Sequence, residues 1–144
     1  MLTRQEINLI RNFNRQYVIQ LGVLSRRTYH TDLTWPQARL LIEIGLHHLQ
    51  TPMELSRQLN LDKSYTSRLI NQLVKQGILR KEKSHRDGRS VVVTLTNAGE
   101  EVFQTINQRS DEQVRTLIKN LSPEKQAEFL AAVTTIKKLI FLKK

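Results

Sequence analysis

The 144-residue sequence contains no cysteine and only five glycines. Without cysteine the chain can form no disulfide, no thiolate metal site and no thiol-based redox switch. The five glycines are too scattered to build a phosphate-binding loop. The N-terminus lacks the apolar core of a signal peptide, and no apolar run approaches the ~20 residues of a membrane span. These absences predict a cytoplasmic protein with no membrane partner.

Signatures of catalysis and metal binding are also missing. The only histidines are His30, His47, His48 and His85, and none of them has the spacing of a metal site. The adjacent His47 and His48 would point ~100° apart on a helix, which does not suit a shared ion. Nothing places serine, histidine and an acid as a catalytic triad. We therefore expect no enzyme activity, no metal and no cofactor.

Acidic residues are outnumbered, with 13 Asp and Glu against 23 Lys and Arg, a formal charge of +10. Residues 53–90 hold nine of the basic and four of the acidic residues, so half of the excess lies in about a quarter of the chain. An anionic partner is indicated. A membrane surface would select basic residues along one face of an amphipathic helix, whereas these cluster around a predicted hairpin. The charge therefore favours nucleic acid.

Residues 51–96 carry most of the functional information, and they begin with a short helix. Thr51 can cap its free amides, Pro52 occupies a position where its missing N–H costs nothing, and Glu54 can complete a capping box. Met53, Leu55 and Leu59 give this helix one apolar side.

A second helix follows over about residues 63–76, with Asp62 as its cap and Gly77 at a position that suits left-handed backbone. At 100° per residue its two faces separate by chemistry. The apolar face carries Tyr65, Leu69, Ile70, Leu73 and Val74, and the polar face carries Ser64, Ser67, Arg68, Asn71 and Lys75. Such a polar face can read base edges and phosphates in a major groove. A solvated surface helix would show the same pattern, so this helix alone does not decide the function.

The next segment favours the DNA-reading interpretation. Residues 78–81 and 90–95 are β-prone, and an Asp-Gly turn signal lies between them. Lys83, His85, Arg86 and Arg89 lie at or near the tip of this hairpin, where they can meet phosphates or a minor groove. Helix, turn, helix and basic hairpin together predict a winged helix-turn-helix.

The expected DNA contacts are the polar face of the second helix and the hairpin tip, with Asp87 orienting Arg89. This set consists of Lys63, Ser64, Thr66, Ser67, Arg68, Asn71, Lys75, Lys83, Arg86, Asp87 and Arg89.

Residues 62–70, 73–79, 87–89 and 95–99 resemble the MarR family of bacterial transcription regulators in their order and spacing. The resemblance covers nearly the whole chain. It implies a homodimer that binds pseudo-palindromic operator DNA as a repressor and that a small ligand can release. Residues 11–15, 21–24, 33–39 and 87–89 also resemble the regulator half of proteins in which a MarR-like domain precedes a GNAT-type acetyltransferase. The alternative is therefore a regulatory or interaction module of such an enzyme.

Apolar residues at helical spacing predict further helices on both sides of this unit. We expect a mainly α fold in one domain, residues 1–144, with a β-hairpin wing. Residues 33–96 would form the winged unit, entered through a helix capped by Thr34 with Gln37 three residues on. Residues 5–24 and 97–142 would form dimerisation helices, the last one beginning at Ser122 and Pro123. Alternatively, these helices fold back on their own chain as a monomeric core.

The family places its ligand pocket between the dimerisation helices and the DNA-binding unit. Here that resemblance implies Phe13, Tyr17, Tyr29, His30, Trp35 and Arg39 as candidate ligand contacts. Ordinary core packing would use the same residues. A winged helix that serves only protein contacts is a third possibility, which the basic wing argues against.

Overall fold

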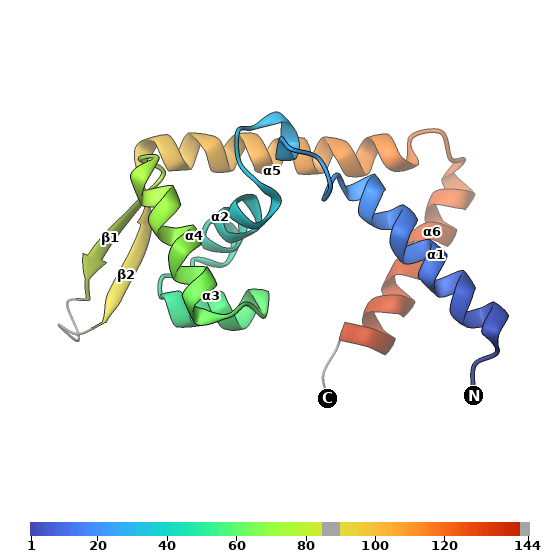
Figure 1. The fold of residues 1–144 in the computed structure, drawn as a ribbon. Coiled ribbons are helices and arrows are strands. Elements are labelled where there is room, and N and C mark those ends of the chain that lie inside the picture. Colours follow the sequence, from blue (N-terminus) through green and yellow to red (C-terminus); the bar gives the residue numbers. More distant parts are fainter. Residues whose placement is uncertain (85–89, 142–144) are drawn as a thin grey trace. The chain divides into compact units, whose positions relative to one another are not determined.

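The computed structural model describes residues 1–84 and 90–141, and its chain divides into two compact units, Met1–Gln108 and Arg109–Lys144. The predicted fold class is confirmed, since the chain is mainly helical with one two-stranded hairpin (Figure 1). The helices are α1 (Arg4–Leu21), α2 (Trp35–His47), α3 (Pro52–Leu59), α4 (Lys63–Lys75), α5 (Asn97–Ile118) and α6 (Pro123–Ile136). A 3-10 turn, Thr28–His30, precedes α2, and a π-helical turn, Lys137–Phe141, follows α6.

Most of the predicted helix starts are confirmed. Before α2, the Thr34 hydroxyl accepts the Gln37 amide at 3.4 Å, and Gln37 Oε1 accepts the Thr34 amide at 3.0 Å, which makes a complete capping box. Asp62 caps α4 and Ser122 caps α6 in the same way, each accepting the amide three residues on. These caps satisfy amides that a helix leaves without internal partners.

Two helix predictions need correction. Thr51 does cap α3, but the Glu54 carboxylate accepts the Gln50 amide at 3.2 Å, so the expected capping box is not formed. The first helix ends at Leu21 instead of residue 24, because Gly22 adopts left-handed backbone with φ 77°. The prediction for Gly77 is confirmed, since its φ is 78°.

The core of the first unit is formed by α2, α3, α4, the hairpin and the first half of α5. Its fully buried side chains include Leu40, Leu41, Leu55, Ile70, Leu73, Leu79, Val93 and Ile106. Two glycines permit close packing around α5: an added Cβ at Gly45 would overlap the Phe103 ring, and one at Gly99 would overlap the Ile78 carbonyl oxygen. The start of α5 is thereby held against α2 and the hairpin.

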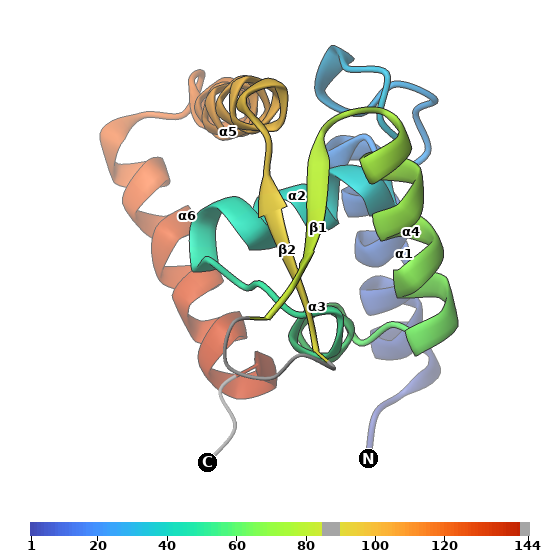
Figure 2. The same ribbon diagram turned by 90° about the vertical axis from the view of Figure 1, so that its left-hand side faces the viewer.

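Strands β1 (Leu79–Lys83) and β2 (Val91–Leu95) pair antiparallel, with Leu79 opposite Leu95 and Lys83 opposite Val91. Figure 2 shows β2 running from beside α3 to the start of α5. The Val93 amide donates to the Gln50 carbonyl at 2.6 Å, which ties the hairpin to the connection between α2 and α3. The hairpin is therefore anchored to the helices and not merely appended to them.

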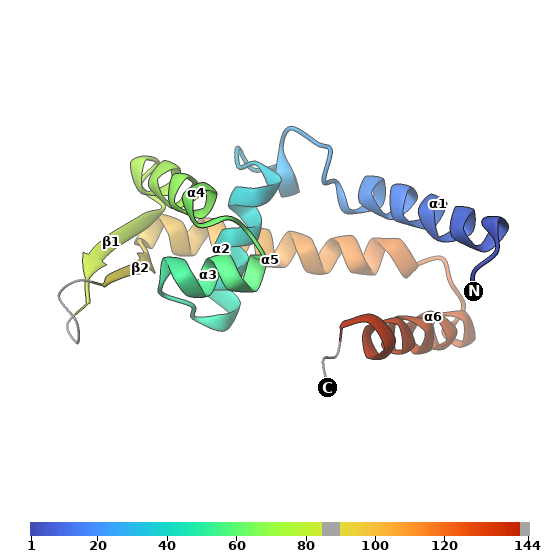
Figure 3. The same cartoon turned by 60° about the horizontal axis from the view of Figure 1, so that its bottom comes forward.

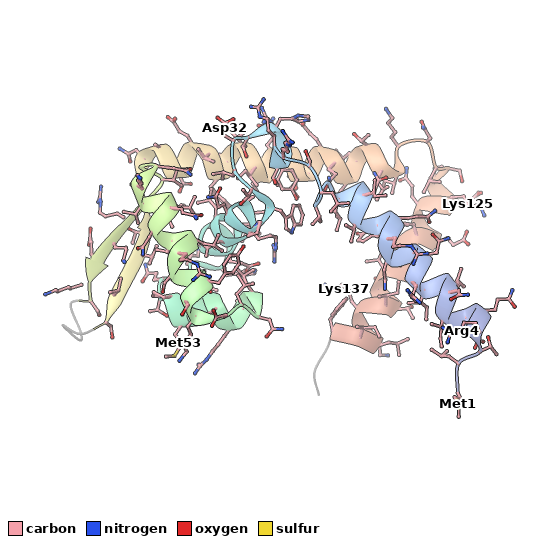
Figure 4. The ribbon with its side chains drawn as sticks, viewed as in Figure 1. Met1, Arg4, Asp32, Met53, Lys125 and Lys137 are labelled. Atoms are coloured by element: carbon pink, nitrogen blue, oxygen red, sulfur yellow. The ribbon has the colours of Figure 1, made fainter. Side chains whose placement is uncertain are left out.

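Helices α1 and α6, which the structure describes in full, bury none of their residues. Side chains project from all around both helices, with Arg4 labelled on α1 and Lys125 on α6 (Figure 4). Exposed large apolar residues include Leu9, Ile10, Phe13, Tyr17 and Ile19 on α1 and Leu130, Val133 and Ile136 on α6. None of the helices in the described part of the chain is long and apolar enough to cross a membrane.

Candidate nucleic-acid interface

Helix α4 presents a polar face whose orientation is fixed by the burial of its other side. Leu69, Ile70 and Leu73 are buried in the core. The exposed residues include Lys63, Ser64, Ser67, Arg68, Asn71 and Lys75, as predicted. Figure 3 shows α4 together with α2 and α3 beside the hairpin. The face therefore carries hydrogen-bonding groups and three cations on a helix that the core holds in place.

Thr66 was expected to contact DNA, and this prediction is wrong. Its side chain has 0% exposure, and its hydroxyl donates to the Asp62 carbonyl at 2.9 Å. Position 66 lies three and four residues before Leu69 and Ile70, so it shares their buried side of the helix. A threonine is small enough to be buried there because its hydroxyl finds a partner one turn back.

The guanidinium of Arg68 lies over the ring of Tyr65, 5.7 Å from the ring centroid. Tyr65 is partly buried against the core, so the ring provides a fixed platform. A cation over an aromatic face is attracted to the ring by its quadrupole. This contact limits the positions that the exposed Arg68 side chain adopts in front of α4.

A contact between β1 and α4 was missed by the sequence reasoning. Lys81 Nζ donates to Asn71 Oδ1 at 2.9 Å. In a strand, residues two apart share a face, so Lys81 lies on the same side of β1 as the buried Leu79. This alternation of faces along the strand was the only sequence signal that could have placed Lys81 on the helix side of the hairpin. Asn71 thus has a cation as its neighbour.

A groove with a volume of about 450 Å³ lies between the starts of α3 and α4 and the start of β2. It is lined by Thr51, Pro52, Met53, Lys63, Ser67, Ser90 and Val91. Met53 was expected on the buried side of α3, but it is 48% exposed. The groove extends the exposed face of α4 to the N-terminus of α3, and the sequence pattern gave no sign of it.

The hairpin tip is described only at its base. Lys83 is exposed at the end of β1, and the Ser84 amide donates to the Ser90 carbonyl at 2.8 Å. The predictions for Arg86, Asp87 and Arg89 lie outside the described residues.

The six candidate ligand contacts have intramolecular neighbours. Phe13 and Tyr17 stack on each other along α1, with ring centroids 5.5 Å apart. The rings of Tyr29 and Trp35 are tilted, with centroids 6.0 Å apart. His30 is exposed, and its carbonyl accepts a hydrogen bond from Arg27 at 3.3 Å.

Arg39 pairs with Glu43 one turn along α2, with Nη2 and Oε1 separated by 2.8 Å. Glu43 is 3% exposed, and within the described residues its Oε2 accepts no hydrogen bond. His47 Nε2 lies 3.5 Å from that oxygen. No group of three or more histidine and acidic side chains in the described part of the chain could hold a metal ion.

Comparison with known proteins shows which family and which solved structures this chain is similar to. Residues 31–90 match the profile of the MarR family. The HTH-type transcriptional regulator YfiV of Bacillus subtilis is 28% identical over 99 residues, which are 68% of this chain and 62% of that protein. The organic hydroperoxide resistance transcriptional regulator of Bacillus subtilis is 29% identical over 68 residues, 47% of this chain and 46% of that protein. This chain thus matches less than two thirds of the length of either relative.

Solved structures agree over almost the full length. Wild-type MarR from E. coli in its apo form has a TM-score of 0.73 and 25% identity, covering 94% of this chain and 97% of that one. Streptococcus pneumoniae FabT, crystallised in complex with DNA, has a TM-score of 0.75 and 24% identity, covering 96% and 97%. The two Bacillus subtilis relatives are both named transcriptional regulators. Residues 31–90 of this chain are thus similar to the MarR family, and the fold is that of these winged-helix proteins.

Proposed function

We propose that this protein is a homodimeric repressor that binds a pseudo-palindromic operator in double-stranded DNA. The observation that carries the proposal is the exposed face of α4. Serine hydroxyls, one amide, a guanidinium and two ammonium groups lie together there, on a helix anchored by Leu69, Ile70 and Leu73. These groups have the donors and acceptors that base edges and phosphates require.

Each α4 would enter a major groove, with Ser64, Ser67, Arg68 and Asn71 toward the bases. Lys63 and Lys75, at the two ends of the helix, would contact the flanking phosphates. Lys83 lies at the end of β1 nearest the hairpin tip, and the basic residues Arg86 and Arg89 follow in the sequence. The wing would place these charges at the adjacent minor groove, with Asp87 orienting Arg89.

The groove beside α4 supports a backbone contact in the same region. Lys63 and Ser67 line it together with Thr51, at the start of α3. A DNA strand that runs along α4 would bring phosphates to this groove, where the ammonium of Lys63 and the N-terminal end of α3 favour negative charge.

The homodimer is supported by the apolar surfaces of α1 and of α6. Neither helix buries a residue within its own chain, although both carry several large apolar side chains. Covering such side chains contributes roughly 25 cal/mol per Å². A two-fold dimer would present two copies of α4 to half-sites whose centres are ~10 bp apart, or a multiple of that.

A small-molecule effector would release the protein from DNA. The PcaV transcriptional regulator from Streptomyces coelicolor was crystallised in complex with its natural ligand. In this chain the aromatic pairs Phe13–Tyr17 and Tyr29–Trp35 supply flat apolar surfaces. A ligand would release DNA only if it bound one spacing of the two α4 helices more tightly than another.

An acetyltransferase-linked module is the second candidate function. It rests on the resemblance of residues 11–15, 21–24, 33–39 and 87–89, and the relatives named above are regulators. Inspection of the downstream reading frame for an in-frame acetyltransferase would separate the two candidates.

The direct test is fluorescence anisotropy of the full chain with a duplex selected from a random pool, against a scrambled duplex, at two salt concentrations. We expect binding at least ~10³-fold tighter to the selected duplex, weakening steeply with salt. Equal, weak and salt-sensitive binding to both duplexes would leave only a basic surface and would contradict the proposal.

The α4 face is tested by Arg68→Ala, with Arg115→Ala as the matched control. Arg115 lies in the last turn of α5, outside the proposed interface, and is also exposed. Arg68→Ala should lower affinity for the selected duplex by ~1–3 kcal/mol, because it removes one base or phosphate contact. Equal effects of the two variants would mean that Arg68 contributes only its net charge.

A further inference from the structure

The contact between β1 and α4 determines which atoms Asn71 can offer to DNA. Lys81 Nζ lies 2.9 Å from Asn71 Oδ1. A lysine ammonium has three donors and no acceptor, so the amide oxygen must face it and the amide nitrogen must face away. The orientation of the Asn71 amide is therefore set by the chemistry of its neighbour, although oxygen and nitrogen look alike in most structures.

This orientation changes the base that Asn71 suits. An isolated asparagine reads adenine with both atoms, because its oxygen accepts from the N6 amino group while its nitrogen donates to N7. Here the oxygen already accepts from Lys81. A second lone pair remains on that oxygen, but the ammonium beside it repels the partial positive charge of an adenine amino group. Recognition of adenine by Asn71 is thus disfavoured.

The pair suits guanine instead. Asn71 retains two amide N–H donors and Lys81 retains two ammonium donors, and both side chains are exposed. Guanine presents two acceptors in the major groove, N7 and O6, with no donor between them. A cluster of donors matches that edge, and the positive charge of Lys81 strengthens each hydrogen bond to it.

We propose that Lys81 is a specificity-determining residue that acts through Asn71, so that the two side chains together select guanine at one position of each half-site. The inference rests on the proposed DNA-binding function. It adds a residue of the strand to a recognition surface that otherwise belongs to the helix. It also assigns Asn71 a base different from the one that its side chain reads alone.

Arg80 provides a matched control within the same strand. Neighbouring residues in a strand point to opposite faces, so Arg80 lies on the other side of β1 from Lys81. Its guanidinium is 3.7 Å from the Glu82 carboxylate, which is on that same side. Lys81→Met and Arg80→Met each remove one positive charge from β1 and keep a long side chain, but only the first removes the partner of Asn71.

The experiment selects preferred duplexes from a random pool with the full-length wild type, Lys81→Met, Arg80→Met and Asn71→Ala, after circular dichroism has shown each to be folded. Affinities are then measured for duplexes that differ only at the guanine position. We expect the wild type and Arg80→Met to prefer guanine there. Lys81→Met should shift the ratio of affinities for guanine and adenine toward adenine by about tenfold. Asn71→Ala should lose the base preference at that position and keep it elsewhere in the site. In the Asn71→Ala background, Lys81→Met should no longer change base preference.

The possible failures are distinct. A wild type that selects no sequence overturns the proposed function, and this inference falls with it. A wild type that selects a sequence, with Lys81→Met weakening all duplexes equally, would assign Lys81 to a phosphate and overturn the inference alone. An unchanged base preference in Lys81→Met, or adenine at the position that depends on Asn71 in the wild type, would overturn it as well.

Discussion

Helix α2 and the first and last α-helices, α1 and α6, have opposite environments. In α2, seven of the 13 residues are buried, including Leu40, Leu41 and Ile42. In α1 and α6, with 18 and 14 residues, none is buried. All three carry apolar residues at helical spacing, so the amphipathic pattern alone does not reveal whether a helix finds its partner inside its own chain.

The difference indicates two kinds of stability in one molecule. Residues 33–106 close a core from α2, α3, α4, the hairpin and the first part of α5. The apolar side chains of α1 and of α6 gain little until another surface covers them. The winged unit should therefore respond to changes in its own core, whereas α1 and α6 should respond to the association of two chains.

The largest effect is expected from charges placed on the apolar side of α6. In Leu130→Asp/Ile136→Asp, each proposed dimer would bury four carboxylates, and even one uncompensated buried charge costs ~3–5 kcal/mol. The dissociation constant should rise at least ~100-fold. Sedimentation equilibrium of the full chain measures this shift toward monomer.

Thr135→Asp is the control for this prediction. Position 135 lies ~140° around the helix from Leu130, on the polar side, and it is also exposed. This variant should sediment like the wild type. A Leu130→Asp/Ile136→Asp variant that stays dimeric would mean that α6 does not contribute to the interface.

A somewhat smaller effect is expected from removing core side chains of α2. Leu41→Ala deletes a side chain with 0% exposure and should lower the free energy of unfolding by ~2–5 kcal/mol. Leu46→Ala, in the same helix but 49% exposed, should lower it by less than ~1 kcal/mol. Urea unfolding followed by the fluorescence of Trp35 measures both. Similar losses would show that α2 is packed on both sides in the assembled protein.

Features that depend on a few neighbouring residues were predictable from the sequence. The caps at Thr34, Asp62 and Ser122 are hydrogen bonds to amides three residues away, so they require only the helix that they begin. The polar face of α4 was predictable for the same reason, since helical periodicity separates Arg68 and Asn71 from Leu69 and Ile70.

Features that depend on packing between elements were not predictable. Lys81 and Asn71 are ten residues apart, and they meet only because β1 packs beside α4. The Glu54 carboxylate accepts the Gln50 amide and not the Thr51 amide that a capping box would use, and the residue spacing alone does not distinguish the two. A threonine such as Thr66 has both a methyl group and a hydroxyl, so its residue type fits an exposed or a buried position. Its hydrogen bond to the Asp62 carbonyl accounts for the buried one.

The smallest effect is expected from removing a capping box, which occurs both in the buried helix α2 and in the exposed helix α1. Thr34 and Gln37 form the box of α2, and Thr3 and Glu6 form that of α1, where the Thr3 amide donates to Glu6 Oε2 at 2.7 Å. Thr34→Ala should lower the free energy of unfolding by ~1 kcal/mol, because α2 cannot fray without opening the core. Thr3→Ala should lower the free energy of unfolding, as followed by Trp35 fluorescence, by less than ~0.3 kcal/mol, since the first turn of α1 can open locally. Urea titrations of the two variants at one protein concentration make the comparison. Equal losses would mean that α1 unfolds together with the winged unit, and the distinction between the two regions would then fail.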